Sequence, residues 1–443
     1  MIDLTNNKIL KSIVLFTIPI FIGEFLQQLY TLVDSIFVGR FIDTAALASI
    51  GAVQPIYGLI TSIFLGVSIG FSILLAYQKG EGKSEEYSKT IYTLFIVTIV
   101  FYLILFFLKN ISTDGIVSFM HLSPDISENG IIYLNILMQG MIFCFVQLSL
   151  GAILRAFGDT KTPLIMSISG SLINIVLDYI FVGRLKWGIK GAAYATLIAH
   201  LASLVLILPA VFYIYKLKFK HIMSVKFSLS YLKRAVLYGI PLAIQYIFLS
   251  IGVILLVKII LPLGVTVMGA FTIIGRLEPF ISMLFLNLSS GLTTFTAQNY
   301  GAEKYDRIKE GLIKVLLTVF VLSIIEGVGV IICSGYISGI FTTDINTKKI
   351  VIDYLIITSP FLFLYGIMVV YHGFLNGLGK TIVPLICTII SFLVVRIPLS
   401  YFFRDWFGYK GLMWTVVIGW FVGLVYTYIS KVIIFKKKDF QNK

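Results

Sequence analysis

Apolar stretches of about 20 residues recur along the whole chain, and they constrain its fold more than any other feature. An α-helix rises about 1.5 Å per residue, so a helix of this length crosses the ~30 Å hydrocarbon core of a bilayer. A transmembrane β-barrel would show alternating segments of about ten residues instead. Because 58% of the 443 residues are hydrophobic and only 13% are charged, we predict an all-α polytopic membrane protein.

About twelve membrane-spanning helices are predicted from the lengths of these stretches. They cover residues 13–38, 46–77, 90–108, 131–154, 162–183, 191–214, 235–260, 265–297, 312–334, 351–376, 382–403 and 411–434. The first run is too long for the core of a signal peptide and lacks a small-residue cleavage site, so we interpret it as a retained helix. Cys144, Cys333 and Cys387 lie in apolar spans and are odd in number, which argues against a disulfide framework.

The net charge of +14 is explained by topology rather than by a nucleic-acid partner. Most Lys and Arg residues fall in alternate loops, on the side that also receives both chain ends. Cytoplasmic loops of membrane proteins carry this excess of positive charge. We therefore expect a multi-pass protein with both termini in the cytoplasm and no nucleic-acid partner.

The chain contains an internal duplication. QKGEGK (78–83) resembles NYGAEK (299–304), and the separation is 301 − 80 = 221 residues. ILRAFGDTKTPL (153–164) resembles FLNGLGKTIVPL (374–385), and 384 − 163 is also 221. A constant offset over about 200 residues is a strong repeat signal.

The duplication predicts two six-helix lobes related by a pseudo-two-fold axis along the membrane normal, because an even number of spans makes parallel repeats. The predicted domains are an N-lobe at 1–215 that contains a cation site, a cytoplasmic linker at 216–234, and a C-lobe at 235–443. Transporters with such repeats bind substrate between their halves.

Two aspartates interrupt the apolar spans of the first lobe. Insertion of an aspartate at the centre of a membrane helix costs about 2.5–3.5 kcal/mol, so such residues usually face inward and serve function. Asp34 corresponds to Leu256 in the second lobe, and Asp178 corresponds to Leu399. The carboxylates therefore belong to the first lobe alone, which favours a functional role over a purely structural, hydrogen-bonded one.

Polar residues extend from each aspartate along one helix face. Gln27 and Tyr30 share a stripe with Asp34, and Asn174 shares one with Asp178. If the two stripes meet, their carboxyl groups can exchange protons or, when ionised, bind Na⁺. The sequence leaves the choice of ion open. It contains no spacing of a metal-ligand motif among its four histidines, and no organic cofactor is expected.

Further candidates come from the same lobe. Thr196 and His200 share a face of the predicted sixth helix, and Pro19 can kink the first helix. Its repeat partner Pro241 makes the break a shared feature of both lobes. We expect the cavity to be lined by Tyr30, Gln27, Tyr133, Asn135, Gln139 and His200. The roles of Glu24, Arg276, Glu326 and Arg396 stay open.

Four segments together resemble the signature segments of the multidrug and toxic compound extrusion (MATE) family. They are GRFIDTAALASIGAVQP (39–55), ILRAFGDTKTPLI (153–165), WGIKGAAYAT (187–196) and TAQNYGAEKYDRI (296–308). An aspartate in the first helix and Asn-xxx-Asp in the fifth resemble the prokaryotic DinF-type branch. This resemblance implies that the cation site lies in the N-lobe. The residues that fit the pattern are Asp34, Asp178, Asn174, Tyr30, Thr196, Tyr133 and Pro19.

The NorM-type branch of the family has additional acidic residues in the seventh and tenth helices. Here the comparable stretches read QYIFLSIGV (245–253) and FLYGIMVVYHG (363–373), without an acid. A sodium site of the NorM type in the second lobe is therefore not expected.

The resemblance implies antiport: export of amphipathic, often cationic, drug-like molecules against inward H⁺ or Na⁺ flow. It also implies the plasma (inner) membrane of a prokaryote and function as a monomer. A metal site at Asp34, Asp178 and Asn174 is expected only if the ion is Na⁺. The main alternative is a lipid-linked oligosaccharide flippase of the same superfamily, although the acidic first lobe argues against it. An enzyme is not expected, since no catalytic set is found.

Overall fold

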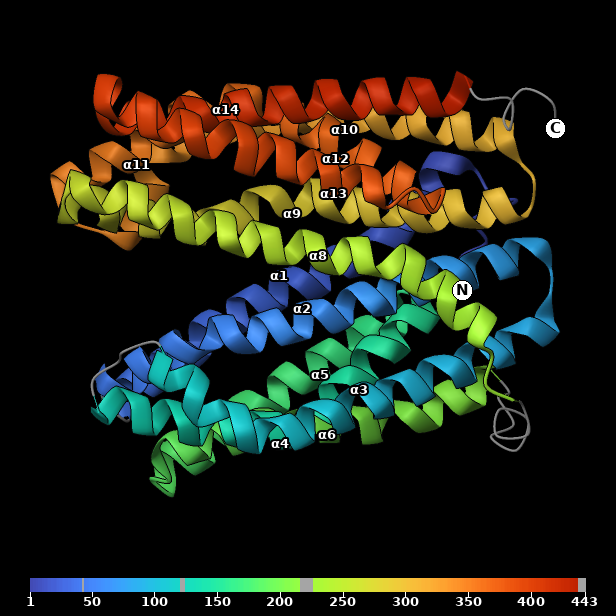
Figure 1. Ribbon diagram of the computed structural model, residues 1–443, viewed down its shortest axis with the longest axis horizontal. Coiled ribbons are helices and arrows are strands. Elements are labelled where there is room, and N and C mark those ends of the chain that lie inside the picture. The colour runs from blue at the N-terminus through green and yellow to red at the C-terminus, as the bar shows by residue number, and fades with distance from the viewer. Residues whose placement is uncertain (42–43, 120–123, 216–225, 437–443) are drawn as a thin grey trace. The chain divides into compact units, whose positions relative to one another are not determined.

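Helices occupy the predicted apolar spans in the computed structural model (Figure 1). The structure describes the backbone of residues 1–41, 44–119, 124–215 and 226–436. It describes the side chains of these residues except at 30–41, 44–48, 84–85, 108–119, 124–126, 210, 212–215 and 435–436. Within these ranges no residue lies in a β-strand.

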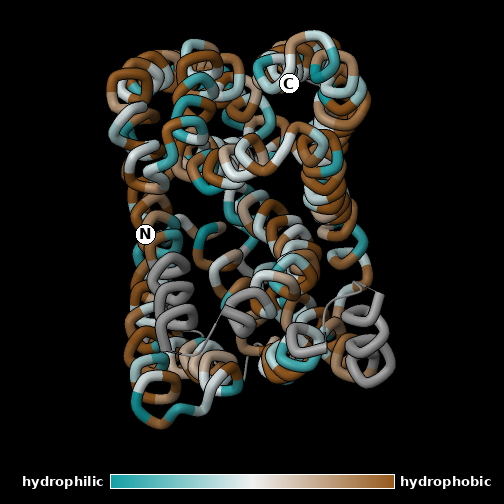
Figure 2. The backbone as a smooth tube through the Cα atoms, turned by 90° about the vertical axis from the view of Figure 1, so that its left-hand side faces the viewer, coloured by the Kyte–Doolittle hydropathy of each residue, from teal (hydrophilic) through white to brown (hydrophobic). Residues whose placement is uncertain are grey.

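Six long helices make up the first lobe. Their bounds are α1 (Ile9–Phe41), α2 (Thr44–Glu81), α3 (Ser84–Phe119), α4 (Pro124–Ala156), α5 (Lys161–Asp178) and α6 (Gly188–Tyr215). A π-helical segment, η1 (Tyr179–Arg184), continues α5. Most turns of the helices are brown in Figure 2, which marks hydrophobic residues, as expected for segments that face lipid or one another.

The second lobe repeats this arrangement with more interruptions. Its α-helices are α8 (Leu229–Ile260), α9 (Val265–Gly301), α10 (Tyr305–Phe341), α11 (Ile345–Thr358), α12 (Leu362–Gly377), α13 (Ile382–Thr388) and α14 (Ile397–Lys436). Short 3₁₀ segments η2 (Leu261–Leu263) and η3 (Ser359–Phe361) precede α9 and α12, and a π-helical segment, η4 (Ile389–Arg396), joins α13 to α14.

Eleven helical segments in the described ranges are long and apolar enough to cross a membrane. The last of them, Ile382–Ile434, is 53 residues long and contains Gly408, whose φ of 59° and ψ of −144° are not helical. This glycine divides the segment into the two spans predicted at 382–403 and 411–434. The fold is therefore the predicted one: an all-α membrane protein with about twelve spans in two six-helix lobes.

The hydrophobic cores of the two lobes are built from equivalent positions. In the first lobe Tyr133 packs with Val53, Ala192 and Ala193. In the second lobe the corresponding cluster contains Tyr354, Ile274, Leu412 and Met413. The offsets are 354 − 133 = 221, 274 − 53 = 221 and 412 − 192 = 220. The sequence repeat is thus also a repeat of side-chain packing.

By their internal contacts the residues form two compact units. The first unit comprises Met1–Ile2 and Ile18–Leu237, and the second comprises Asp3–Thr17 and Tyr238–Lys443. Each unit boundary falls inside the first helix of a lobe, at equivalent places, because 238 − 18 = 220. The contact units and the lobes defined by the repeat therefore place residues 3–17 differently.

Residues 3–17 belong to the second unit because side chains at its α9–α10 corner bind their main chain. Asn299 donates to the carbonyl of Leu4 over 3.0 Å, and Lys304 donates to that of Thr5 over 3.0 Å. Arg307 donates to the carbonyl of Asn7 over 2.8 Å. These residues lie in the segment TAQNYGAEKYDRI, so one signature segment of the sequence fixes the start of the chain.

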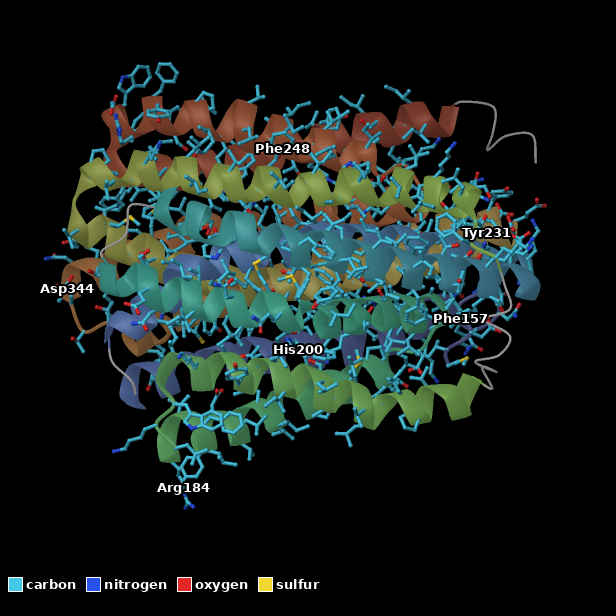
Figure 3. All side chains as sticks on the ribbon, turned by 60° about the horizontal axis from the view of Figure 1, so that its bottom comes forward. Phe157, Arg184, His200, Tyr231, Phe248 and Asp344 are labelled. Carbon is cyan, nitrogen blue, oxygen red and sulfur yellow. The ribbon has the colours of Figure 1, made fainter. Side chains whose placement is uncertain are left out.

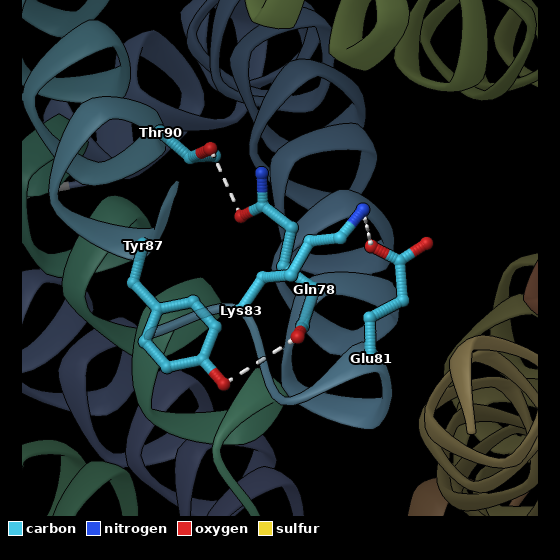
Figure 4. A network of polar contacts seen from close by, with 5 residues as sticks. All are labelled: Gln78, Glu81, Lys83, Tyr87 and Thr90. Atoms are coloured by element: carbon cyan, nitrogen blue, oxygen red, sulfur yellow. Dashed lines mark hydrogen bonds and ion pairs between the residues drawn. The ribbon is translucent and has the colours of Figure 1, made fainter. Parts of the chain in front are cut away.

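The equivalent α2–α3 corner of the first unit carries a different polar network (Figure 4). Thr90 donates to Oε1 of Gln78 over 3.0 Å, and the hydroxyl group of Tyr87 donates to the carbonyl of Gln78 over 3.4 Å. Lys83 forms a salt bridge with Glu81, with 3.0 Å between Nζ and Oε2. Gln78 corresponds to Asn299 in the repeat, so both corners hold a buried amide at the end of a long helix.

Candidate functional site

The fifth helix buries its polar residues and exposes its apolar ones. Asn174 and Asp178 are only 2% and 1% exposed, whereas Leu172 and Val176 on the other side are 59% and 56% exposed. This arrangement is expected for a membrane helix, because lipid solvates leucine and valine but not an amide or a carboxylate. The interior of the first lobe therefore contains the amide and the acid that the Asn-xxx-Asp motif predicted.

Asn174 connects α5 to α6. Its Nδ2 donates to Oγ1 of Thr196 over 3.5 Å, and Thr196 in turn donates to the carbonyl of Ala192 over 3.1 Å. The first distance is long, which indicates a weak hydrogen bond. The structure thus joins two of the four residues predicted for cation coupling, Asn174 and Thr196, and Asp178 lies one helical turn from Asn174 on the same helix.

Asp178 ends the regular part of its helix. The next residue, Tyr179, points its N–H to the carbonyls of both Ile175 and Val176, and the chain continues as the π-helical segment η1. Leu185, which follows this segment, donates to the carbonyl of Ile180 over 2.8 Å. π-Helical turns widen a helix and occur frequently at functional sites. The carboxylate therefore lies at a local change of helix geometry that the sequence pattern did not reveal.

Gln147 of α4 binds the second polar residue of α6. The Nδ1 atom of His200 lies 2.6 Å from Oε1 of Gln147, and Nε2 of Gln147 donates to the carbonyl of His200 over 3.3 Å. Gln147 also donates to the hydroxyl group of Ser203. Sequence reasoning missed Gln147 and Ser203, because neither is charged nor part of a motif. Their place on the interior faces of α4 and α6 was the available signal.

The cavity candidates on α4 have different environments. Tyr133 is buried among the apolar residues of the first-lobe core, Asn135 is half-buried, and the side chain of Gln139 is exposed. The hydroxyl group of Tyr102 donates to the backbone carbonyl of Gln139 over 2.8 Å. The structure therefore does not gather these three residues at one point.

On α1, Pro19 is buried within the helix and Gln27 is exposed. The side chains of Tyr30 and Asp34 lie outside the described residues. The pairing of Asp34 with Asp178 therefore stays a prediction.

The second lobe has a polar set of its own. The hydroxyl group of Tyr354 donates to Oε1 of Glu278, and Gln245 donates to Oγ1 of Thr388 over 2.8 Å. Arg396 lies over the ring of Phe392, with 4.9 Å from the guanidinium carbon to the ring centroid. Glu278 corresponds to Tyr57 in the first lobe (278 − 57 = 221), so this acid is specific to the second lobe.

Among the described side chains, no group of three His, Cys, Asp or Glu residues lies close enough together to bind a transition metal. The oxygen atoms of Asn174, Asp178 and Thr196 are instead the hard ligands that alkali cations prefer. This donor set fits either a proton held by the carboxyl group or a small hard cation.

The family model MatE matches residues 19–180 and 241–402. The two matches are separated by 241 − 19 = 222 and 402 − 180 = 222 residues, which reproduces the repeat. Together they cover well over half of the chain. The chain belongs to the MatE family. MatE proteins are transporters and not enzymes, and the resemblance seen in the four signature segments is confirmed.

Curated relatives of this MatE protein match over nearly their full length. The chain is 25% identical over 412 residues to the probable multidrug resistance protein YoeA of Bacillus subtilis, covering 90% of this chain and 87% of that one. It is 25% identical over 420 residues to the probable multidrug resistance protein YpnP of the same organism, covering 93% and 92%. It is 23% identical over 424 residues to the multidrug export protein MepA of Staphylococcus aureus, covering 93% and 91%.

Solved structures share the fold of this MatE protein. A MOP superfamily transporter from Pyrococcus furiosus superposes with a TM-score of 0.88 at 23% identity, covering 96% of this chain and 95% of that one. A MATE transporter in complex with MaL6 superposes with a TM-score of 0.87 at 24% identity, covering 96% of each chain. At these identities the likeness shows the fold alone, and the fold agrees with the one predicted.

Proposed function

We propose that this MatE protein is a secondary active multidrug exporter that couples efflux of amphipathic, often cationic compounds to inward movement of H⁺ or Na⁺. The observation that carries the proposal is the buried acid and amide of α5, Asp178 and Asn174, in the membrane-spanning interior of a transporter. A carboxylate in this position is costly, and ionisable residues inside membrane spans usually mark an ion or substrate pathway. The relatives named as multidrug resistance and export proteins support the substrate class.

The coupling ion acts on the charge of Asp178. With the carboxyl group ionised, the interior of the first lobe attracts an organic cation. Protonation removes this charge. A bound Na⁺ compensates it instead, with the oxygen atoms of Asn174 and Thr196 as further ligands. In either case the ion and the organic cation compete for one carboxylate, and competition of this kind is the basis of antiport.

Pro19 provides the place at which α1 can bend. A proline inside a helix removes one backbone hydrogen bond and weakens the helix locally. Pro19 follows the boundary between the two contact units, at Thr17 and Ile18, and Pro241 follows the equivalent boundary in α8. We infer that α1 changes its bend at Pro19 during the cycle and so moves Asp34 relative to the part of the helix that precedes Pro19.

The remaining parts of the proposal follow from the family resemblance and, for the termini, from the distribution of Lys and Arg. The protein resides in the inner membrane of a prokaryote with both termini in the cytoplasm, works as a monomer and needs no cofactor besides the coupling ion. A lipid-linked oligosaccharide flippase stays the alternative. The feature that favours it is Arg396, a cation in a membrane-spanning segment that suits a pyrophosphate group.

Efflux from proteoliposomes tests the proposal. Purified protein is reconstituted, a fluorescent organic cation is loaded, and proton and sodium gradients are applied separately. We expect efflux with one of the two gradients, and loss of the gradient dependence in Asp178→Asn and Asp34→Asn. Asp405→Asn is the matched control, because Asp405 is exposed and pairs with Arg404. Efflux by Asp178→Asn with unchanged gradient dependence would refute the coupling role of that residue.

A further inference from the structure

His200 lies on the interior face of α6 and yet keeps accessible surface. Ser203, Leu204 and Ile207 on the same face are buried, whereas Leu201 and Val205 on the opposite face are exposed. A lipid-facing residue would lie on the same face as Leu201 and Val205. The accessible surface of the half-buried imidazole ring therefore faces the interior of the helix bundle and not the lipid.

His200 also lies far from both ends of the helices. Figure 3 shows it between Arg184, at one end of the first unit, and Phe157 and Tyr231, at the other end. Thr196 precedes it by four residues on the same helix, a rise of about 6 Å at ~1.5 Å per residue. The ring is thus one helical turn from the residue that Asn174 binds.

The hydrogen bonds of Gln147 determine which nitrogen of His200 carries the proton. One end of the Gln147 amide faces the backbone carbonyl of His200, which can only accept, so this end must be the NH₂ group. The other end, Oε1, faces Nδ1 of His200 at 2.6 Å. Because Oε1 can only accept, Nδ1 must carry a hydrogen.

Ser203 completes the same network. Its hydroxyl group donates to the carbonyl of His200 over 3.0 Å and accepts from the NH₂ group of Gln147. Every donor in this set of three residues meets an acceptor, so the orientation of the Gln147 amide is consistent throughout. Gln147 thereby fixes both the position and the tautomer of the imidazole ring.

The other ring nitrogen, Nε2, then bears a lone pair. An imidazolium in the middle of a membrane span needs a carboxylate partner, and no described carboxylate forms an ion pair with His200. In the neutral ring Nδ1 is the donor to Gln147 and Nε2 is the acceptor. Within the described part of the chain, no residue donates to Nε2.

We propose that Nε2 of His200 is a substrate-binding acceptor that recognises amphipathic amines with an N–H group, and that Gln147 is its positioning residue. A protonated amine donates its N–H to Nε2 while the acid of α5 attracts its charge. A quaternary ammonium ion has the same charge but no N–H to donate. His200 therefore separates two kinds of organic cation that Asp178 alone does not distinguish. The assignment deepens the proposed export function and rests on it.

Binding to purified protein in detergent tests the assignment without any ion gradient. The probes are a fluorescent amphipathic tertiary amine, protonated at the assay pH, and its N-methylated quaternary analogue. We expect the amine to bind about tenfold more tightly, as one hydrogen bond to a charged group allows. His200→Asn keeps a donor for Gln147 near the place of Nδ1 but removes Nε2, so it should abolish this preference. His200→Gln, with a polar group near the place of Nε2, should retain part of it.

The role of Gln147 is tested by measuring the tautomer of His200, which a change in packing alone would not alter. In protein labelled with ¹⁵N-histidine, the spectrum reports the tautomer of each ring, and the chain has only four histidines to assign. Gln147→Met should convert His200 to a mixture of tautomers and reduce the amine preference. Gln147→Glu keeps an acceptor for Nδ1–H and should retain the hydrogen on this nitrogen.

Three outcomes would overturn the assignment: wild-type protein without an amine preference, equal weakening of both probes in His200→Asn, or no binding of the amine at all. None of these outcomes decides whether the protein exports drugs, because the efflux assay in proteoliposomes tests the export function independently. Conversely, an amine preference in detergent without gradient-driven efflux in proteoliposomes would contradict the export function and leave the binding site intact.

Discussion

Asn174 on α5 donates to Thr196 on α6 across 3.5 Å, and this contact joins the helix that carries Asp178 to its neighbour. Hydrogen bonds between membrane helices stabilise a protein by only about 0.6 kcal/mol on average. Thr196→Val, which keeps the shape but removes the hydroxyl oxygen, should therefore leave the unfolding temperature nearly unchanged. Because it removes an oxygen atom from the proposed coupling site, it should lower gradient-driven efflux severalfold.

Thr196→Ser is the matched control, because it restores the oxygen and removes only a methyl group. Efflux and thermal unfolding of both variants are measured on the same preparations. A Thr196→Val protein that unfolds several degrees earlier and transports normally would contradict the assignment, since it would make Thr196 a packing residue.

In the second lobe the hydroxyl group of Tyr354 donates to Glu278, whereas Tyr133 occupies the equivalent core position in the first lobe. Tyr354→Phe removes this donor from a half-buried carboxylate, which costs about 1–3 kcal/mol when no other partner replaces it. Glu278→Gln should cost less, because the amide oxygen still accepts from Tyr354. Thermal unfolding of the purified protein provides the comparison.

The double variant with Tyr354→Phe and Glu278→Leu distinguishes a hydrogen bond from general packing. If the pair interacts, the double variant should be more stable than the sum of the two single changes predicts, because neither polar group is left without its partner. Additive losses would show that Tyr354 contributes only through packing.

Much of this architecture could be predicted from the sequence because membrane helices carry a strong signal. The apolar spans and the offset of 221 residues predicted the helices and both lobes. Asn174, Asp178 and Thr196 were predicted as one site because a polar residue in such a span has few places to face other than the interior.

Other features depend on contacts that side-chain patterns do not encode. The docking of residues 3–17 on the second unit uses backbone carbonyls as acceptors for Asn299, Lys304 and Arg307, and every sequence offers carbonyls. The role of Gln147 depends on which residue of α6 it faces. The π-helical segment after Asp178 depends on a choice of backbone hydrogen bonds that differs by one residue from an α-helix.

Asp3 at the start of the chain gives a pH-dependent prediction outside the membrane-spanning segments. Partial burial alone would raise the pKa of Asp3, but hydrogen bonds from Asn6 and Thr5 outweigh it and lower the pKa from 3.8 to about 2. A lowered pKa in the folded state means that ionised Asp3 stabilises the turn at residues 3–6 above about pH 4. This contribution is lost as the pH falls towards 2.

A ¹³C titration of the aspartate carboxyl groups, with Asp3→Asn to identify the resonance, measures this pKa directly. Because the residue is exposed, solvent screens the interaction and we expect only a small change in overall stability. A midpoint at or above 3.8 would show that Asp3 does not hold this turn in solution.

Gly158 follows α4 at a φ of +84°, and a Cβ atom added there would lie 2.3 Å from the carbonyl oxygen of Ile2. The backbone N–H of Ile2 donates to the carbonyl of Gly158 over 2.9 Å, so these two segments of the chain cannot separate without losing this bond. Gly158→Ala therefore combines backbone strain with a steric clash. Gly82 is the matched control, because its φ is +72° and nothing lies within 4 Å of an added Cβ.

Gly82→Ala should cost about 1–2 kcal/mol, the usual penalty for a side chain in the left-handed region. Gly158→Ala should cost more than Gly82→Ala, because the clash with Ile2 is added to the same backbone penalty. Thermal unfolding measures both losses. A protein that begins at Asp3 after proteolytic removal of the preceding residues keeps the strain but loses the clash, so the effect of Gly158→Ala should fall there to that of Gly82→Ala. An unchanged effect after this removal would exclude contact with Ile2 as its cause.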